Sequence, residues 1–243
     1  MTILSIETST RVCSVALAAD GIVVAARKDC ETGNHARQLP LFIEELLQIA
    51  RQKGLRPDAV ALSEGPGSYT GLRIGTATAK GLCYGLDVPL IPIPTTEVLC
   101  AGAKYIVERK KSKEKSNCQM LPLIDARRME VYTALYDADI NPLTDIQAVV
   151  VENKDSLSTF DFERSGLSTA YFGDGAAKCR EILESETWHF IPDIVPDAAN
   201  MFDLAEQYLA KGKARKTAQE LAYYEPFYLK EFVAAKSHVK GLE

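Results

Sequence analysis

The sequence predicts an α/β protein made of two similar lobes, each a mixed five-stranded sheet with flanking helices. Three observations support this class. Short apolar runs of strand length alternate with longer stretches of helical periodicity. The strand–turn–strand pattern that opens the chain returns near residue 120. A glycine-rich turn joins a buried strand to a helix at residues 63–75.

The chain opens with a predicted three-stranded meander. Residues 2–6 form an apolar run, residues 12–18 alternate between apolar and polar side chains, and residues 22–26 form a third short run. The dipeptide Asp20-Gly21 between the last two runs is typical of a tight hairpin.

Residues 34–53 show the spacing of an amphipathic helix, and Gly54 is a typical C-terminal cap. Pro40 leaves the start of this helix open. A helix that begins at residue 34 contains Pro40 and is expected to kink there, whereas a helix that begins near Leu39 places it in the tolerated first turn.

The apolar run 59–62 is followed by SEGPGSYTGLRIG at residues 63–75. Gly supplies positive φ and Pro fixes φ, so we expect a strand, a sharp turn and a helix N-terminus. Such a joint is either an anion site or a place where two backbones pack closely. It is not a P-loop, because Gly71 is followed by Leu72 and Arg73 rather than by Lys and Ser or Thr.

The helix expected over residues 70–85 carries two stripes of small residues. Each interior Gly costs a helix about 1 kcal/mol relative to Ala. The stripes therefore predict the close approach of another backbone. They consist of Gly71, Gly75 and Ala79, and of Ala77, Gly81 and Gly85.

Further along the chain the sequence predicts a short edge strand with two prolines, a helix capped by Thr95 or Thr96, and a charged linker RKKSKEK at residues 109–115. Later strands are expected at residues 120–124, 130–136, 148–151 and 188–191, and helices after Gly175 and over 198–211. An aromatic cluster at 223–232 is expected to pack on the body. The expected domains are a first lobe at 1–108, a second lobe at 116–217 and a tail at 218–243.

The second lobe repeats the first weakly in sequence. In both lobes a strand ends in a carboxylate, Glu7 or Asp125, passes through a short polar turn and returns as a strand. Aligning these two carboxylates also pairs Ile3 with Leu121, Ile6 with Ile124, Ala16 with Ala134 and Leu17 with Leu135.

Composition narrows the class of protein. The 243 residues are 47% hydrophobic and 25% charged, which is typical of a globular chain, and the net charge of −5 argues against unaided binding to nucleic acid. The six cysteines form no C-x-x-C pair, so we expect a reducing, cytoplasmic location. The chain start does not resemble a signal peptide, and no apolar run is long enough to span a membrane.

The paired carboxylate-tipped hairpins resemble the actin, sugar-kinase and Hsp70 superfamily, whose lobes have a ribonuclease H-like fold. Within it, the chain is similar to the bacterial TsaB family, also called YeaZ. The resemblance rests on ILSIETST, NHARQLPLFIEELL, SEGPGSYTGLRIG, IDARRMEVY and EPFYLKE. It covers nearly the whole chain and is best over residues 1–135.

This resemblance implies a role in making threonylcarbamoyladenosine at position 37 of tRNAs that read codons beginning with adenine. It implies a non-catalytic scaffold that binds a catalytic TsaD-like paralogue, with a TsaE-like ATPase joining them. It further implies a homodimer when the chain is alone, and tRNA contacts that are indirect if they exist. ATP would belong to the partners, and the chain itself would hold no cofactor.

The resemblance also implies that the first lobe pairs with the partner through two helices. The expected interface residues are the apolar positions of the first helix and small or apolar positions of the second. They are Leu39, Phe42, Ile43, Leu46, Leu47, Leu72, Gly75 and Ala79.

The catalytic features of the superfamily are missing from the sequence. Related enzymes bind a metal through two His four residues apart, but His35, His189 and His238 stand alone, so we expect no metal site and no catalytic residue. The hairpin glycines that admit a phosphate are also replaced. The residues that mark a vestigial nucleotide site are Glu7, Ser9, Thr10, Asp125, Gly173 and Gly175.

Several alternatives remain open from the sequence. Glu7 and Asp125 are either turn-capping carboxylates or remnants of a phosphate site, and residues 110–115 are either a solvated linker or a tRNA contact. The chain could instead be an ATP-binding phosphotransferase or ATPase of the same superfamily. A peptidase is disfavoured, because neither H-E-x-x-H nor G-x-S-x-G occurs.

Overall fold

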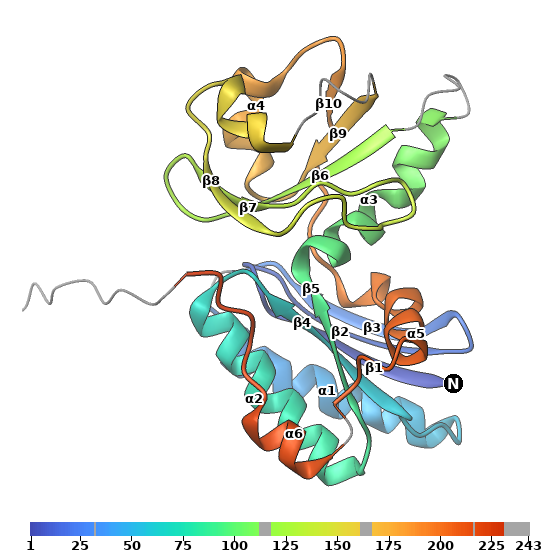
Figure 1. Ribbon diagram of the computed structural model, residues 1–243. Helices are drawn as coiled ribbons and strands as arrows, with labels where there is room; N and C mark the ends of the chain where they lie inside the picture. Colours follow the sequence, from blue (N-terminus) through green and yellow to red (C-terminus); the bar gives the residue numbers. More distant parts are fainter. Residues whose placement is uncertain (32, 112–117, 161–166, 216, 231–243) are drawn as a thin grey trace, which may run out of the picture.

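The computed structural model describes the chain except for residues 32, 112–117, 161–166, 216 and 231–243. It consists of two lobes, one above the other in Figure 1, with α3 (Thr95–Lys111) joining them. Each lobe is built on a mixed five-stranded sheet with flanking helices, as the sequence predicts.

The first sheet has the strand order β3-β2-β1-β4-β5. Its strands β1, β2 and β3 form the predicted antiparallel meander, while β4 and β5 join it in parallel. The two-proline segment is the edge strand β5. The strands span Thr2–Glu7, Cys13–Ala19, Ile22–Asp29, Ala59–Gly65 and Leu90–Pro94.

The second sheet repeats this topology in the order β10-β9-β6-β7-β8. Strand β6 pairs antiparallel with β7 and parallel with β9, as β1 pairs with β2 and β4. The duplicated architecture inferred from the two hairpins is therefore confirmed. The strands span Cys118–Asp125, Glu130–Thr133, Gln147–Val150, Ser168–Phe172 and Trp188–Phe190.

The two hairpins differ by one residue, which corrects part of the predicted alignment. Ser5 pairs with Ala16 in the first lobe, whereas the equivalent Leu123 pairs with Thr133 in the second. Ala16 thus corresponds to Thr133 rather than Ala134. The second turn is one residue shorter, so the alignment slips after the turn although it holds along β1 and β6.

Helices α1 (His35–Gln52) and α2 (Tyr69–Leu86) cover one face of the first sheet (Figure 1). Helix α1 begins before Pro40 and contains it, so the start near Leu39 is wrong. The Nε2 atom of His35 lies 2.9 Å from the carbonyl oxygen of Thr10 and 3.2 Å from that of Val12. Since both partners are acceptors, Nε2 carries the proton and ties the helix start to the first hairpin.

Helix α3 packs on both lobes and extends further than expected. Its side chains Val98 and Leu99 share a core with β-strand residues of both lobes. The Thr96 hydroxyl also bonds the Tyr136 hydroxyl of the second lobe at 2.7 Å. The helix runs through residues 109–111 of the predicted linker, and the remainder of that segment lies outside the described residues.

After the second lobe the chain returns to the first. The predicted helix 198–211 is split into η3 (Ala198–Asn200) and α5 (Phe202–Ala210), and α5 packs on β5 and β1. A domain boundary at residue 217 therefore separates α5 from the sheet that it covers. The apolar side chains of α5 fill the first-lobe face opposite α1 and α2, and this long-range contact has no local sequence signal.

Three shorter helices complete the described fold. Helix α4 (Ala176–Leu183) and η1 (Lys154–Phe160) cover the second sheet on the face opposite α3. Helix α6 (Ala218–Tyr223) lies beside α2 (Figure 1). It carries a capping box of Thr217 and Glu220, which satisfies two backbone donors at its start.

Residues 231–232 of the predicted aromatic cluster lie outside the described residues, and the described part packs on the body only in part. Tyr224 is 8% exposed, whereas its neighbour Tyr223 is 81% exposed.

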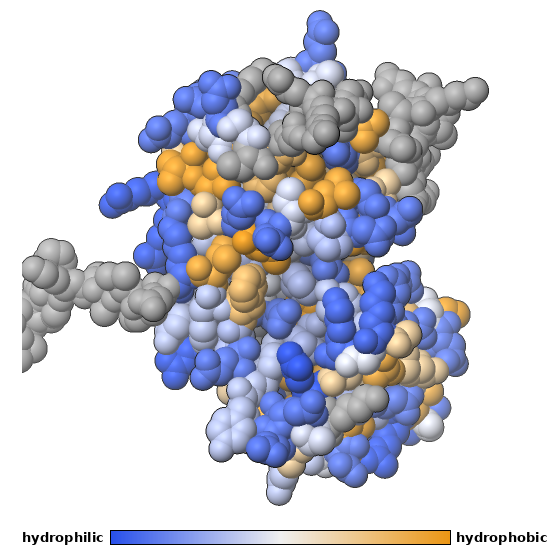
Figure 2. Space-filling view, viewed as in Figure 1, coloured by the Kyte–Doolittle hydropathy of each residue, from blue (hydrophilic) through white to orange (hydrophobic). Residues whose placement is uncertain are grey.

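The second lobe exposes apolar side chains too, and Figure 2 shows them gathered over β7 and β8. Leu143 and Val150 are about half exposed. No helix of the described residues has the length and apolar character that a membrane crossing requires.

Candidate functional site

The glycine-rich turn of the first lobe is a close-packing joint. The Ser68 N–H donates to the carbonyl oxygen of Ser9 at 2.6 Å, and the Thr8 hydroxyl donates to the carbonyl oxygen of Gly71 at 2.9 Å. A Cβ atom on Gly67 would overlap the Ser9 carbonyl, and one on Gly71 would overlap the Thr8 carbonyl. The loop therefore packs closely against the first hairpin.

Glu7 is buried at the end of β1, and its carboxylate caps the turn that follows the strand. Its Oε1 accepts hydrogen bonds from the Ser9 N–H at 2.5 Å and the Ser9 hydroxyl at 2.6 Å, while its Oε2 accepts none from the residues that the structure describes. Burial raises the pKa of Glu7 to about 7, and the Ser63 and Ser9 hydroxyls offset this only in part. Thr10, also buried, accepts from the Val12 N–H at 3.3 Å.

The second hairpin uses its backbone donors in the same self-contained way. The Asp125 N–H donates to Asp174 Oδ1 at 3.0 Å, the Ala126 N–H to the carbonyl oxygen of Glu130 at 3.1 Å, and the Arg127 N–H to Asp125 Oδ1 at 3.1 Å. Lys178 forms an ion pair with Asp125. These donors are therefore taken by oxygens of the chain itself.

Gly173 and Gly175 pack against strand β6. Gly173 has φ +111°, and a Cβ there would overlap the Leu123 carbonyl oxygen. A Cβ on Gly175 would lie 3.0 Å from the Asp125 nitrogen. These glycines allow close backbone packing in the structure.

Carboxylates accept backbone hydrogen bonds at both turns. The N–H groups of Ser9, Asp125 and Arg127 donate to the side chains of Glu7, Asp174 and Asp125, so these three donors are not free for a phosphate. Of the six predicted residues, Glu7, Ser9 and Thr10 lie in the first hairpin and Asp125 in the second, while Gly173 and Gly175 lie in the loop between β9 and α4. They act there as turn-capping and packing residues. No cluster of three metal-binding side chains occurs among the described residues.

The predicted interface residues lie on α1 and α2, but most face inward. Six of the eight are buried, and only Phe42 and Leu47 are half-buried. The buried six are Leu39, Ile43, Leu46, Leu72, Gly75 and Ala79. Four of them, Leu39, Ile43, Leu46 and Ala79, belong to the core between these helices and the first sheet.

The two stripes on α2 have different surroundings. Gly71 and Gly75 touch Thr8, the residue that follows β1, which explains these two glycines of the first stripe within the chain. In contrast, nothing lies within 4 Å of a Cβ built on Gly81 or Gly85. The second stripe is exposed, and no contact within the described part of the chain requires glycine at these two positions.

A groove of about 490 Å³ runs between the outer sides of α1 and α2, beside the second stripe. Tyr84, 81% exposed, stands next to it on α2. We refer to the groove and the exposed stripe together as the helix-pair face. The groove is lined by Pro40, Ile43, Glu44, Leu47, Gln48, Arg51, Thr78, Gly81 and Leu82. The predicted interface includes Ile43 and Leu47 of this set. The other lining residues are polar, charged or small, or lie outside the apolar positions on which the prediction is based.

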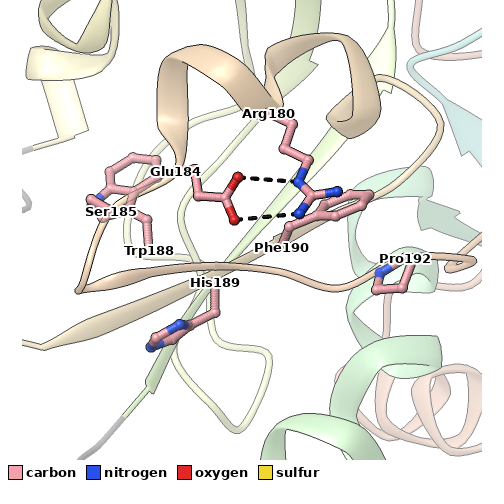
Figure 3. A pocket seen from close by; sticks show the side chains of 7 residues that line it. All are labelled: Arg180, Glu184, Ser185, Trp188, His189, Phe190 and Pro192. Atoms are coloured by element: carbon pink, nitrogen blue, oxygen red, sulfur yellow. Dashed lines mark hydrogen bonds and ion pairs between the residues drawn. The ribbon is translucent and has the colours of Figure 1, made fainter.

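A second hollow, of about 360 Å³, lies on the second lobe beside α4 and β10 (Figure 3). Arg180 lies over the Phe190 ring at 5.5 Å and is paired with Glu184 at 3.2 Å. Figure 3 shows His189 pointing away from this pair. The charged groups of the hollow are thus engaged with each other, and none of the predicted site residues lines it.

Comparisons with known proteins agree with the fold. A family model described as TsaD, tRNA N6-adenosine threonylcarbamoyltransferase, matches residues 30–237. Among solved structures, a Pseudomonas aeruginosa protein described as similar to peptidase YEAZ has a TM-score of 0.74 and 22% identity, over 94% of this chain and 99% of that one. YeaZ from the same organism has a TM-score of 0.71 at 21% identity, over 94% and 99% of the two chains. These structures support the fold alone.

Curated relatives are closer in sequence. The tRNA threonylcarbamoyladenosine biosynthesis protein TsaB of Escherichia coli is 32% identical over 97% of this chain and 97% of its own length. The TsaB protein of Haemophilus influenzae is 36% identical over 54% of this chain and 52% of its own length. With near-complete coverage at this identity, the chain belongs to the TsaB (YeaZ) family.

Proposed function

We propose that this chain is a non-catalytic scaffold subunit in the synthesis of threonylcarbamoyladenosine at position 37 of tRNAs that read codons beginning with adenine. In this role it binds and supports a catalytic TsaD-like paralogue. The family relationship supports the pathway. The helix-pair face, whose glycines have no internal packing reason, is the observation that carries the scaffold role.

The energetics of α2 favour a covering partner. Gly81 and Gly85 each destabilise the helix by about 1 kcal/mol relative to Ala. No close contact with the described part of the chain offsets this loss at either position. Small residues on a helix surface let another helix approach closely. A partner helix seated between α1 and α2 would recover that cost, and it would also cover Leu47 and Leu82.

The match to the transferase model supports a paralogue as the partner, because it implies that partner and chain share a lobe of the same kind. Two such lobes can present equivalent helix pairs to each other. The same argument supports a homodimer when the paralogue is absent. A TsaE-like ATPase would then join the pair, and ATP would be bound by these partners.

The alternative, an ATP-binding phosphotransferase, is not favoured by the site. The hairpin N–H groups of Ser9 and Arg127 are bonded to carboxylates of the chain itself, and the glycine-rich loop is packed against the first hairpin. The role is tested by reconstituting the modification of an unmodified tRNA from purified components. We expect modification by the paralogue and ATPase to require this chain, and equal rates in its absence would contradict the proposal.

A further inference from the structure

A pair of tyrosine rings lies where the C-terminal segment passes the start of α2. The rings of Tyr69 and Tyr228 are 5.0 Å apart between centroids and inclined by 36°. The Arg73 guanidinium lies 5.5 Å from the centroid of the Tyr69 ring and is exposed. Both rings are half-buried, so the pair forms an aromatic surface with a cation at its edge.

The backbone that carries Tyr228 is held in place by the first lobe. The Phe227 N–H donates to the carbonyl oxygen of Glu64 at 2.8 Å, and the Tyr224 hydroxyl donates to Glu64 Oε2 at 3.2 Å. A Cβ on Gly65 would lie 2.5 Å from the Phe227 carbonyl oxygen, so glycine is required for this approach. Figure 1 shows the segment running along α2 toward the second lobe.

The same segment reaches the second lobe next to exposed arginines. Lys230 forms an ion pair with Glu130, and both Lys230 and Arg127 act on the pKa of Tyr132. Arg127 and Arg128 are exposed at the turn between β6 and β7. Within the described part of the chain, neither arginine forms an ion pair.

The acids near this surface are largely neutralised. Glu130 is paired with Lys230, and Asp125 is paired with Lys178. Glu225 also acts on Tyr228, so one carboxylate remains close to the rings. The exposed arginines Arg73, Arg127 and Arg128 outnumber it, and the surface is locally basic although the chain carries a net charge of −5.

We infer that this surface, made by Tyr69, Arg73, Tyr228, Lys230, Arg127 and Arg128, binds single-stranded RNA directly. Exposed aromatic rings stack unpaired bases, and flanking cations bind the phosphates of the same strand. A fixed platform between two basic groups is the arrangement used for an unpaired loop rather than a duplex, whose bases are not available for stacking. The inference rests on the proposed function, because it takes the RNA to be the tRNA that the complex modifies. This chain would then contact the tRNA together with its partner.

The test measures binding of an unmodified tRNA transcript to the complex of this chain with the TsaD-like paralogue, by fluorescence anisotropy at several salt concentrations. We expect the double variant R127N/R128N to weaken binding about tenfold and to lower the slope of log K against log salt by about two, because two phosphate contacts are lost. Asn is chosen because φ is +72° and +47° at these positions, and Asn tolerates this region. R127K/R128K is expected to restore most of the affinity.

The aromatic part has its own variants. Tyr228→Ala is expected to weaken binding by about tenfold with little change in the salt slope, whereas Tyr228→Phe keeps the ring and stays within about twofold of wild type. The matched control K53Q/K211Q removes two exposed cations elsewhere and is expected to leave tRNA binding within about twofold.

Association with the paralogue is measured separately without RNA. Unchanged tRNA affinity in R127N/R128N and in Tyr228→Ala would overturn the inference. So would a loss of paralogue binding in these variants, since the surface would then be a protein interface. If the wild-type pair does not assemble, the proposed function fails, and the same variants are measured on the chain alone with the same expected order.

Discussion

The hydroxyl of Thr8 donates a hydrogen bond of 2.9 Å to the carbonyl oxygen of Gly71, across the joint between β1 and α2. Both residues are buried, and the absence of a side chain at Gly71 is what lets α2 lie this close to the strand. The joint packs the glycine-rich loop against the first hairpin. It thereby fixes the start of the helix that forms half of the helix-pair face.

The first prediction contrasts two glycines of α2. Gly71→Ala is expected to destabilise the chain by about 1–3 kcal/mol, since the added Cβ overlaps the Thr8 carbonyl oxygen. Gly81→Ala is expected to stabilise it by about 0.5–1 kcal/mol, because its Cβ meets only open space. Urea unfolding of both variants measures the difference. Equal effects at the two positions would contradict the distinction between the two stripes.

The second prediction concerns the oligomeric state of the isolated chain. Gly81→Leu places a large side chain in the groove between α1 and α2, so it is expected to weaken self-association at least tenfold while the fold is kept. Sedimentation equilibrium measures the dissociation constant. Glu206→Leu, which adds the same side chain at an exposed position of α5, serves as the control. A wild-type chain that stays monomeric at all accessible concentrations would contradict the homodimer.

The third prediction follows from the buried carboxyl of Glu7. Its pKa is about 7 in the folded chain against an ordinary value of 4.5, so the folded state holds a proton that the unfolded state releases. Stability from this group is therefore full below pH 4.5 and is lost as the pH rises through 7. The loss amounts to about 3 kcal/mol.

Glu7→Gln removes this titration and isolates it from other carboxyls. Between pH 5 and pH 8, the unfolding free energy of wild type is expected to fall relative to that of the variant. Denaturant unfolding at both pH values measures it. A difference that stays constant over this range would show that Glu7 titrates normally.

The fourth prediction addresses the phosphotransferase alternative. A ligand at ten times its dissociation constant stabilises a protein by about 1.4 kcal/mol, which raises the melting temperature by several degrees. Because the N–H groups of Ser9, Asp125 and Arg127 in the hairpins are bonded to the chain's own carboxylates, we expect millimolar Mg–ATP to shift the melting temperature of the isolated chain by less than about 1 °C. A larger shift that GTP or inorganic phosphate does not reproduce would reveal a nucleotide site.

Much of the fold is predictable because its signals are local. Asp20-Gly21 marks the hairpin between β2 and β3, Gly54 ends α1, and the carboxylates Glu7 and Asp125 mark equivalent strand ends. The return of α5 to the first sheet depends on contacts between distant segments, so no local pattern reveals it. Adjacent Tyr223 and Tyr224 differ tenfold in exposure for the same reason.

The candidate site was less predictable than the fold. Helical periodicity identifies two small-residue stripes on α2 but not which one meets β1. That choice depends on Thr8, whose backbone and side chain touch Gly71 and Gly75. Likewise, the apolar side of α1 is the side that its own sheet buries, so a search for interfaces among strongly apolar positions such as Leu39 and Leu46 finds core residues.

The most direct test of the scaffold role is calorimetric titration of this chain into the purified TsaD-like paralogue. We predict a one-to-one complex with the wild-type chain, affinity at least tenfold weaker with Gly81→Leu, and wild-type affinity with Glu206→Leu. No binding by the wild-type chain, or equal affinity for wild type and Gly81→Leu, would contradict docking through the helix-pair face.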